Sequence, residues 1–120
     1  MIGNDIGAAG SSIKIDGLGI GLDKITVSGN RVDMNGFTPS SGILLNDASN
    51  VHVLVNDLVG LGGSSANALL TTGTTDFVTV RDNLAEGGGT FKFGTTGGDA
   101  SCDPSGGVGS NSTCSGNTLQ

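Results

Sequence analysis

Aromatic residues are scarce in this 120-residue chain, which contains four phenylalanines and neither tryptophan nor tyrosine. An interior with so few rings has to be filled by aliphatic side chains, so we expect stacked Ile, Val and Leu residues rather than an aromatic cluster. The same scarcity disfavours a carbohydrate-binding module, because such modules usually stack aromatic side chains against sugar rings.

Long apolar runs and an excess of basic charge are lacking as well. No stretch of 18 apolar residues occurs, so we expect no segment that spans a bilayer. Five basic residues face eleven acidic ones, giving a net charge of −6, which disfavours nucleic acid and anionic membranes as partners. The start of the chain lacks the basic and apolar regions of a signal peptide. The alternatives to secretion by a signal peptide are export by another route, incorporation into a virion, or origin as part of a longer protein.

Patterns that bind metals or phosphates are lacking too. The single histidine, His52, and the two cysteines, Cys102 and Cys114, do not have the spacing of a zinc site. The Gly-Gly runs at 62–63, 87–89 and 97–98 lack the Lys-Ser/Thr pair that a phosphate-binding loop requires. We therefore predict no cofactor, no metal and no catalytic residue.

A repeat is the main feature that is present. Three segments, Ile25–Asn30, Val51–Asn56 and Val78–Asn83, each begin with a β-branched residue, have Val two positions later and Asn five positions later. Their starts are 26 and 27 residues apart. A period of this length is typical of arrays in which each unit buries its apolar face against its neighbours.

Two further short strands are expected in each repeat. A block of mainly apolar residues precedes the segment, and an alternating strand follows the Asn; turn residues separate them, and no window is long enough for a helix. The preceding blocks are Ile13–Ile15, Ile43–Leu45, Ala68–Leu70 and Phe91–Phe93. The following strands contain Val32 and Met34, Leu58 and Gly60, and Ala85 and Gly87.

Three short strands per repeat describe one coil of a parallel β-helix, in which equivalent strands lie about 4.8 Å apart. Two inward columns are expected. They are Ile25, Val51 and Val78, and Val27, Val53 and Val80. Asn30, Asn56 and Asn83 should form a ladder of side-chain hydrogen bonds at a corner, where an Asn tolerates the left-handed conformation.

This pattern resembles the right-handed parallel β-helix superfamily, the pectate-lyase-like group that also includes phage tailspikes and secreted surface proteins. The resemblance covers Ile13 to Phe93 and implies an all-β solenoid of about three to four coils. It does not specify an activity, since that superfamily contains lyases, hydrolases, isomerases and purely structural members. We expect residues 1–12 to be an irregular cap, residues 13–93 to form the coils, and residues 94–120 to be irregular.

The C-terminal segment, residues 94–120, consists almost entirely of Gly, Ser, Thr, Asn and Asp, which cannot bury enough surface to order it. We expect a disulfide between Cys102 and Cys114, closing a loop worth about 3 kcal/mol. Such a bond implies an oxidising compartment or a virion exterior. Asn111-Ser112-Thr113 also matches a glycosylation sequon.

Asp57, Arg81 and Asp82 are the candidates for catalysis, because Asp57 and Asp82 follow the third strand position in neighbouring coils. Two carboxylates about 5 to 9 Å apart could hydrolyse a glycoside, and with Arg81 they could bind or eliminate a sugar acid. Solvated corner residues with a surface ion pair explain the same pattern. Thr26, His52 and Thr79 are expected to form an exposed row.

We therefore expect a non-enzymatic structural or adhesive module of an extracellular, cell-surface or virion assembly, with a tailspike or fibre part as the nearest resemblance. Open coil ends favour self-association or docking onto a larger assembly, and polysaccharide is a candidate ligand. The alternative is a fragment of a polysaccharide lyase or glycoside hydrolase that acts on acidic glycans.

Overall fold

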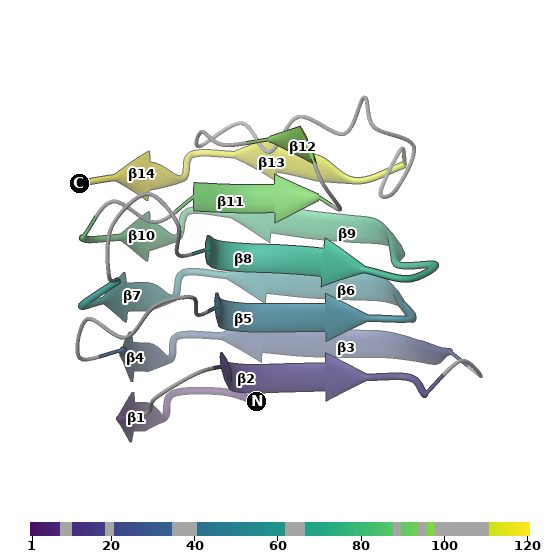
Figure 1. The fold of residues 1–120 in the computed structure, drawn as a ribbon, viewed down its shortest axis with the longest axis horizontal. Coiled ribbons are helices and arrows are strands. Elements are labelled where there is room, and N and C mark those ends of the chain that lie inside the picture. Colours follow the sequence, from purple (N-terminus) through teal and green to yellow (C-terminus); the bar gives the residue numbers. More distant parts are fainter. Residues whose placement is uncertain are drawn as a thin grey trace.

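The computed structural model consists of short strands joined by turns (Figure 1). It describes residues 1–7, 11–18, 21–34, 41–61, 67–87, 90–93, 96–97 and 111–120. Within these ranges there is no helix. The fold is all-β, with mainly parallel strands arranged in three sheets.

The strands are distributed over three sheets, here named A, B and C. Sheet A contains β3 (Leu22–Ser28), β6 (Ala48–Leu54), β9 (Asp76–Arg81) and β13 (Thr113–Ser115). Sheet B contains β1 (Asp5–Gly7), β4 (Arg31–Asp33), β7 (Asp57–Val59), β10 (Leu84–Ala85) and β14 (Thr118–Leu119). Sheet C contains β2 (Ser11–Asp16), β5 (Ser41–Asn46), β8 (Asn67–Thr72), β11 (Thr90–Phe93) and β12 (Thr96–Gly97).

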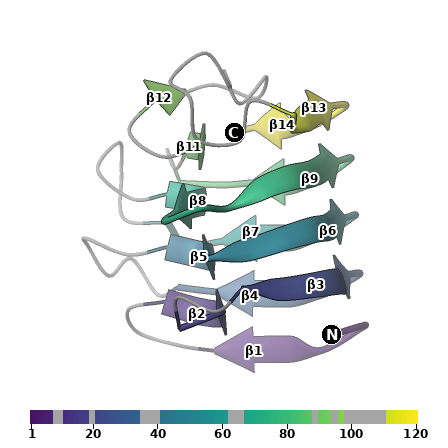
Figure 2. The ribbon, with the colours of Figure 1, turned by 90° about the vertical axis from the view of Figure 1, so that its right-hand side faces the viewer.

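The chain visits sheets C, A and B in turn, and almost every strand pairs with its equivalent one repeat later. We call each such set of three strands a tier: β2 to β4, β5 to β7, β8 to β10, and finally β11 with β13 and β14. The exception is β12, which pairs antiparallel with β11. The tiers stack vertically in Figures 1 and 2, with the two termini at opposite ends of the stack.

The register of sheet A confirms the two predicted inward columns. Val27 lies opposite Val53, and Val53 opposite Val80. The other column is formed by Ile25, Val51 and Val78. All three valines of the first column are fully buried. Because the same side chain recurs at one place in each tier, the interior is a continuous aliphatic stack, as the shortage of aromatic residues predicts.

The register of the strands in sheet C differs by one residue from the alignment that the sequence suggested. Ile43 lies opposite Leu69, and not opposite Ala68, while Leu45 lies opposite Thr71. A shift of one residue exchanges the two faces of a strand, so the inward position goes to Thr71, which is fully buried, and Leu70 is half-buried. The apolar run Ala68 to Leu70 suggested the wrong alignment, because the true core positions are Leu69 and Thr71, and Thr71 is polar.

The corner that follows sheet B also differs from prediction. Met34 N–H donates to the Val59 carbonyl, and Leu61 N–H donates to the Glu86 carbonyl, so Leu61 occupies the place predicted for Gly60. Met34 and Leu61 are both buried. Gly60 has a φ of 67° and acts as an extra corner residue, a conformation that glycine adopts without steric cost.

The N-terminal segment, residues 1–12, is not irregular as predicted. The Met1 carbonyl accepts a hydrogen bond from Ser28 N–H, and Ile2 forms a parallel bridge with Ser28 along the edge of β3. The chain then continues into β1, which pairs with β4, and β2 begins at Ser11. The reason is that Met1–Asn4 lies at the same place in the repeat as Val27–Asn30, with Gly-Asn at the corner in both.

The C-terminal segment, residues 94–120, likewise contains regular strands. Thr113 to Ser115 form β13 against β9, and Cys114 lies opposite Val80. The Ser112 hydroxyl accepts a hydrogen bond of 2.8 Å from Val78 N–H. Backbone pairing and polar side-chain hydrogen bonds order the described residues of this segment, together with Cys114 and Leu119, which pack against the core. Polar composition alone did not reveal this pairing.

The corners between sheets A and B share a left-handed residue, which directly precedes each corner asparagine. These residues are Gly3, Gly29, Val55, Asp82 and Gly116, with φ of 64°, 64°, 55°, 55° and 66°. The expectation that the asparagine itself takes this conformation is therefore wrong. Val55 is the unfavourable member, because β-branched side chains clash with the backbone in this region.

Replacing Val55 with glycine is expected to raise the free energy of unfolding by about 1 kcal/mol, since the left-handed penalty disappears. Little packing is lost, because Val55 is 63% exposed. The matched control is Gly29→Val, which should destabilise by about 1–2 kcal/mol at the equivalent corner. A Cβ at Gly29 would lie 3.8 Å from its nearest neighbour, so the loss would not come from a clash. Urea unfolding measures both changes, and a destabilised Val55→Gly would contradict the explanation.

Candidate functional site

The most regular polar feature is the column of corner asparagines. Asn30 Nδ2 donates to Asn56 Oδ1 at 2.9 Å, and Asn56 Nδ2 donates to Asn83 Oδ1 at 2.9 Å. The backbone N–H of each donor residue binds the same oxygen, at 3.0 and 2.9 Å. All three residues are 1% exposed. The structure thus brings Asn30, Asn56 and Asn83 together in one buried ladder.

The ladder is longer than the sequence suggested. Asn4 Nδ2 donates to Asn30 Oδ1 at 3.0 Å, and Asn83 Nδ2 donates to Asn117 Oδ1 at 2.9 Å. Both added residues follow a left-handed glycine, in Gly3-Asn4 and Gly116-Asn117. That dipeptide is the signal by which they could have been found, since Gly29-Asn30 has the same form.

A second polar column lies where the strands of sheet C end, and sequence reasoning missed it. Asn46 Nδ2 donates to Asp16 Oδ1 at 3.0 Å, and the Thr72 hydroxyl donates to Asn46 Oδ1 at 2.8 Å. The hydrogen bond from Asn46, the Lys14 ammonium 2.9 Å away and the N–H of Leu18 hold the pKa of the Asp16 carboxyl well below its ordinary value. The correct register of sheet C aligns these three polar residues.

Asp76 connects the third tier to the C-terminal residues. Its carboxylate accepts hydrogen bonds from the Asn111 side chain at 2.7 Å and the Asn111 N–H at 2.9 Å. Partial desolvation raises its pKa, but the hydrogen bonds from Asn111 and from Phe77 N–H outweigh this, so the pKa lies below the ordinary value. The pair therefore fixes the start of the last strand of sheet A.

The candidate catalytic residues are placed on opposite sides of the ladder. Asp57 follows Asn56 and lies opposite Leu84 in sheet B, whereas Asp82 precedes Asn83. Asp57 lies 3.5 Å from the Arg31 guanidinium, and Asp82 lies 3.1 Å from that of Arg81. The two aspartates are not equivalent positions of neighbouring tiers, contrary to the sequence-based reasoning. Arg81 and Asp82 form an exposed surface ion pair, which contributes little to stability. Asp57 is half-buried, and its Oδ1 is buried without a hydrogen-bond partner among the described residues.

The row Thr26, His52 and Thr79 lies on the outer face of sheet A. The register places these residues opposite one another in successive strands, and Thr113 continues the row. Thr26, His52 and Thr113 are exposed and Thr79 is half-buried. The row is a polar strip along the outside of the stack and has no carboxylate beside His52 in its own strand.

Cys114 is disulfide-bonded, and no described cysteine is free. Cys102 lies outside the described residues, so the pairing of Cys102 with Cys114 stays a prediction. Among the described side chains, no group of three or more His, Cys, Asp and Glu residues is placed to hold a metal ion.

None of the elements described above is a helix of the length and apolarity needed to cross a membrane. No known protein family, no curated protein and no solved structure matches this chain. Its function therefore has to be inferred from the geometry of the tiers, the ladders and the surface.

Proposed function

We propose that this chain is a right-handed parallel β-helix that serves as a structural or adhesive module of an extracellular, cell-surface or virion assembly, of the tailspike or fibre kind. The observation that carries the proposal is the ladder of five asparagines. Its buried amides bind one another and the backbone, so the polar interior holds tiers together and does not face a substrate.

The cyclic order of the sheets supports the β-helix. Apart from β12, the chain returns to each sheet after passing through the other two, and the new strand lies parallel to its predecessor in that sheet. Connections between parallel strands of one sheet are right-handed in nearly all proteins, because of the twist of the strands. A right-handed solenoid is the winding that satisfies both conditions.

The state of the acidic groups supports a non-enzymatic role. A general acid in a glycosidase needs a raised pKa so that it is protonated near neutral pH. The pKa values of Asp16 and Asp76 are instead lowered, so these carboxylates stay ionised. The candidates Asp57 and Asp82 are paired with arginines at the surface.

The disulfide at Cys114 supports a location outside the reducing cytosol. Acidic composition and a surface strip of hydroxyl groups are compatible with contact to polysaccharide, which remains the candidate ligand of an adhesive module. Adhesion would then rely on polar contacts, since the exposed row of sheet A has no aromatic platform.

Incubation of the purified chain with pectate and with alginate tests the proposal against the lyase or hydrolase alternative. We expect no new reducing ends, no unsaturated products and no loss of viscosity. Cleavage of either glycan that is lost in both Asp57→Asn and Asp82→Asn would overturn the structural role. The matched control is Asp23→Asn, an exposed aspartate of sheet A outside the candidate group.

A further inference from the structure

The β13–β14 segment, residues 111–120, pairs with two strands of the third tier. β13 lies parallel to β9, and β14 lies parallel to β10. Four backbone N–H groups of residues 78–87 also donate hydrogen bonds of 2.8 to 3.1 Å to the segment. They run from Val78 to the Ser112 hydroxyl, from Asp82 to the Ser115 carbonyl, from Asn83 to Asn117 Oδ1 and from Gly87 to the Gln120 carbonyl. These four amides, here named the reporter amides, lose their acceptors if the segment leaves.

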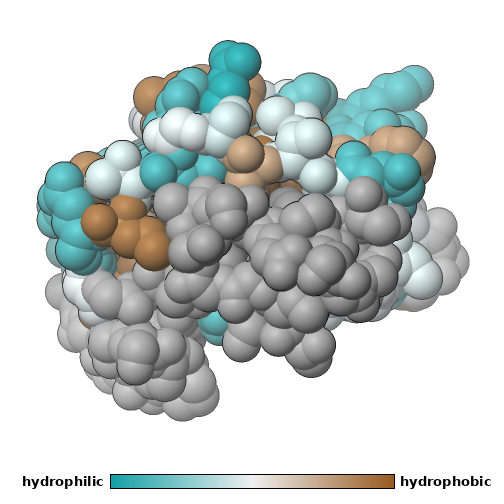
Figure 3. Space-filling view, turned by 90° about the horizontal axis from the view of Figure 1, so that it is seen from above, coloured by the Kyte–Doolittle hydropathy of each residue, from teal (hydrophilic) through white to brown (hydrophobic). Residues whose placement is uncertain are grey.

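Little apolar burial holds the β13–β14 segment in place. Where the second and third tiers have two inward valines in sheet A, the segment has Ser112 and Cys114. Cys114 and Leu119 pack against the core but are only half-buried, whereas Val53 and Val80 are fully buried. Seen from above, the described residues at this end of the stack show small apolar groups between hydrophilic ones (Figure 3). Apolar burial therefore stabilises this contact less than it stabilises the contacts between the tiers below.

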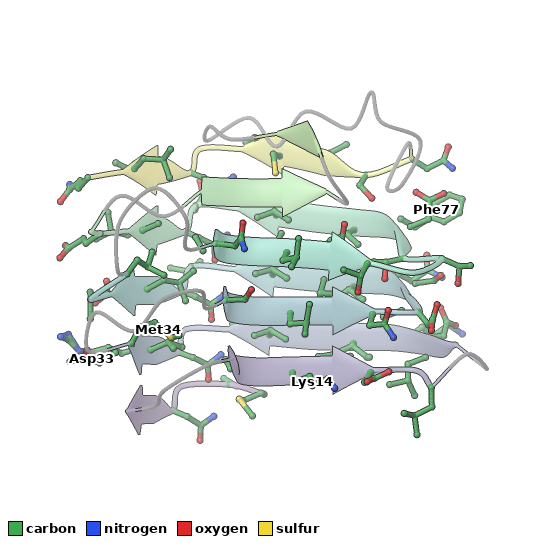
Figure 4. The ribbon with its side chains drawn as sticks, in the orientation of Figure 1. Lys14, Asp33, Met34 and Phe77 are labelled. Atoms are coloured by element: carbon green, nitrogen blue, oxygen red, sulfur yellow. The ribbon has the colours of Figure 1, made fainter. Side chains whose placement is uncertain are left out.

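Polar contacts along the segment are accessible to water. Asn111 donates to the Asp76 carboxylate at 2.7 and 2.9 Å, at the corner that Phe77 marks in Figure 4. Asn83 Nδ2 donates to Asn117 Oδ1 at 2.9 Å. Asn111 is exposed and Asn117 is half-buried. Water replaces these partners when the segment leaves, so the net contribution of each hydrogen bond to docking is small.

A disulfide bond adds a covalent constraint to these contacts. Cys114 is disulfide-bonded, and its expected partner is Cys102, the other cysteine of the chain. A cross-link that closes a loop of about a dozen residues disfavours the open state by about a hundredfold, because it removes conformations from that state. The segment thus depends on a covalent bond where the tiers below depend on buried valine columns.

We propose that this disulfide is a redox switch for docking of the β13–β14 segment. In the oxidised chain the segment is docked on β9 and β10. In the reduced chain it leaves both strands, while the tiers below stay folded through their own columns and asparagine rungs. The switch does not depend on the structural role proposed above.

Reduction needs a thiol reductant and balances as a two-electron exchange. Two electrons pass from a dithiol to the disulfide, whose S–S bond breaks. Each cysteine sulfur takes up one proton and becomes a thiol, and the dithiol is oxidised to a disulfide. Docking is thereby coupled to the compartment, because thiols are kept reduced in the cytosol and disulfides persist outside it.

Amide hydrogen exchange of the oxidised and the dithiothreitol-reduced chain, followed by NMR, tests the switch. In the oxidised chain we expect the reporter amides to exchange at least about a hundredfold more slowly than an unstructured peptide. In the reduced chain they should exchange within about tenfold of that peptide. The matched amides one tier lower are Val55, Asn56 and Leu61, which donate to the Arg81 carbonyl, Asn83 Oδ1 and the Glu86 carbonyl. These should stay protected by at least about a hundredfold in both states.

Cys102→Ser separates the cross-link from the packing, because it leaves the Cys114 side chain in the valine column. We expect this variant to show the reduced pattern without any reductant. Thr113→Ala is the matched control, since Thr113 is an exposed residue of β13 and its replacement retains the disulfide. It should show the oxidised pattern.

Reporter amides that stay protected in the reduced chain, with both thiols shown to be free by alkylation, would overturn the switch. Loss of protection at Val55, Asn56 and Leu61 to the same degree would also overturn it, because the disulfide would then hold the whole fold. A Cys114 that remains disulfide-bonded in Cys102→Ser would overturn the pairing on which the switch depends.

Discussion

Replacing Asn56 with alanine is expected to lower the free energy of unfolding by about 3–5 kcal/mol. The Asn56 amide makes four hydrogen bonds inside the stack: it accepts two from Asn30 and donates to Asn83 Oδ1 at 2.9 Å and to the Val27 carbonyl at 3.0 Å. Truncation leaves these buried partners unpaired, and each lost partner costs more than an exposed hydrogen bond contributes. The effect should therefore be much larger than that of removing an exposed asparagine side chain from the end of the ladder.

Urea unfolding followed by circular dichroism measures the change, with Asn4→Ala as the matched control. Asn4 is the exposed end of the same ladder, and its backbone N–H keeps the hydrogen bond to Asn30 when the side chain is removed. We expect a loss of under about 1 kcal/mol there. Equal losses in the two variants would show that burial does not determine the strength of the ladder.

Replacing Leu58 with alanine is expected to cost about 2–5 kcal/mol, through lost apolar burial and the cavity left behind. Leu58 is fully buried in sheet B, between Val32 and Ala85 in the neighbouring strands. Its packing is close, since a Cβ built on Gly42 would lie 3.3 Å from Leu58 Cδ2. Sheet C therefore presses directly against this side chain, and little relaxation is available to fill the gap.

Leu84→Ala is the matched control for Leu58→Ala. Leu84 lies in the next strand of sheet B, in the row of Asp57, and is only half-buried. Its truncation should cost under about 1.5 kcal/mol, because much of its side chain already meets water. Thermal and urea unfolding report both values. If Leu84→Ala proved as damaging as Leu58→Ala, the assignment of inward and outward rows in sheet B would be wrong.

The inward columns of sheet A were predictable because a single residue type repeats there. Val27, Val53 and Val80 recur at a constant spacing, and alternation fixes which side of a strand they occupy. The ladder of Asn30, Asn56 and Asn83 follows from the same spacing. Neither inference needed any knowledge of contacts between distant residues.

The ends of the stack and the register of sheet C could not be read in the same way. Ser112 and Cys114 stand where valines stand in the earlier tiers, so a search for apolar residues passed over β13. Thr71 occupies a buried position that Leu45 fills in the preceding tier. In each case the interior position is held by a residue that a search for Val, Ile and Leu does not find, and Ser112 is satisfied there by a hydrogen bond from Val78 of the neighbouring tier.

The sequence by itself determined the period, the all-β class and the aliphatic filling of the interior, because these depend on spacing and side-chain type along the chain. Only the tertiary structure decided which residues lie opposite one another, that the residue before each asparagine is left-handed, and that Asp57 and Asp82 serve different arginines. The register and the Arg31–Asp57 ion pair depend on contacts between residues about one repeat apart. Local propensity cannot specify such contacts, since they exist only once the tiers are stacked.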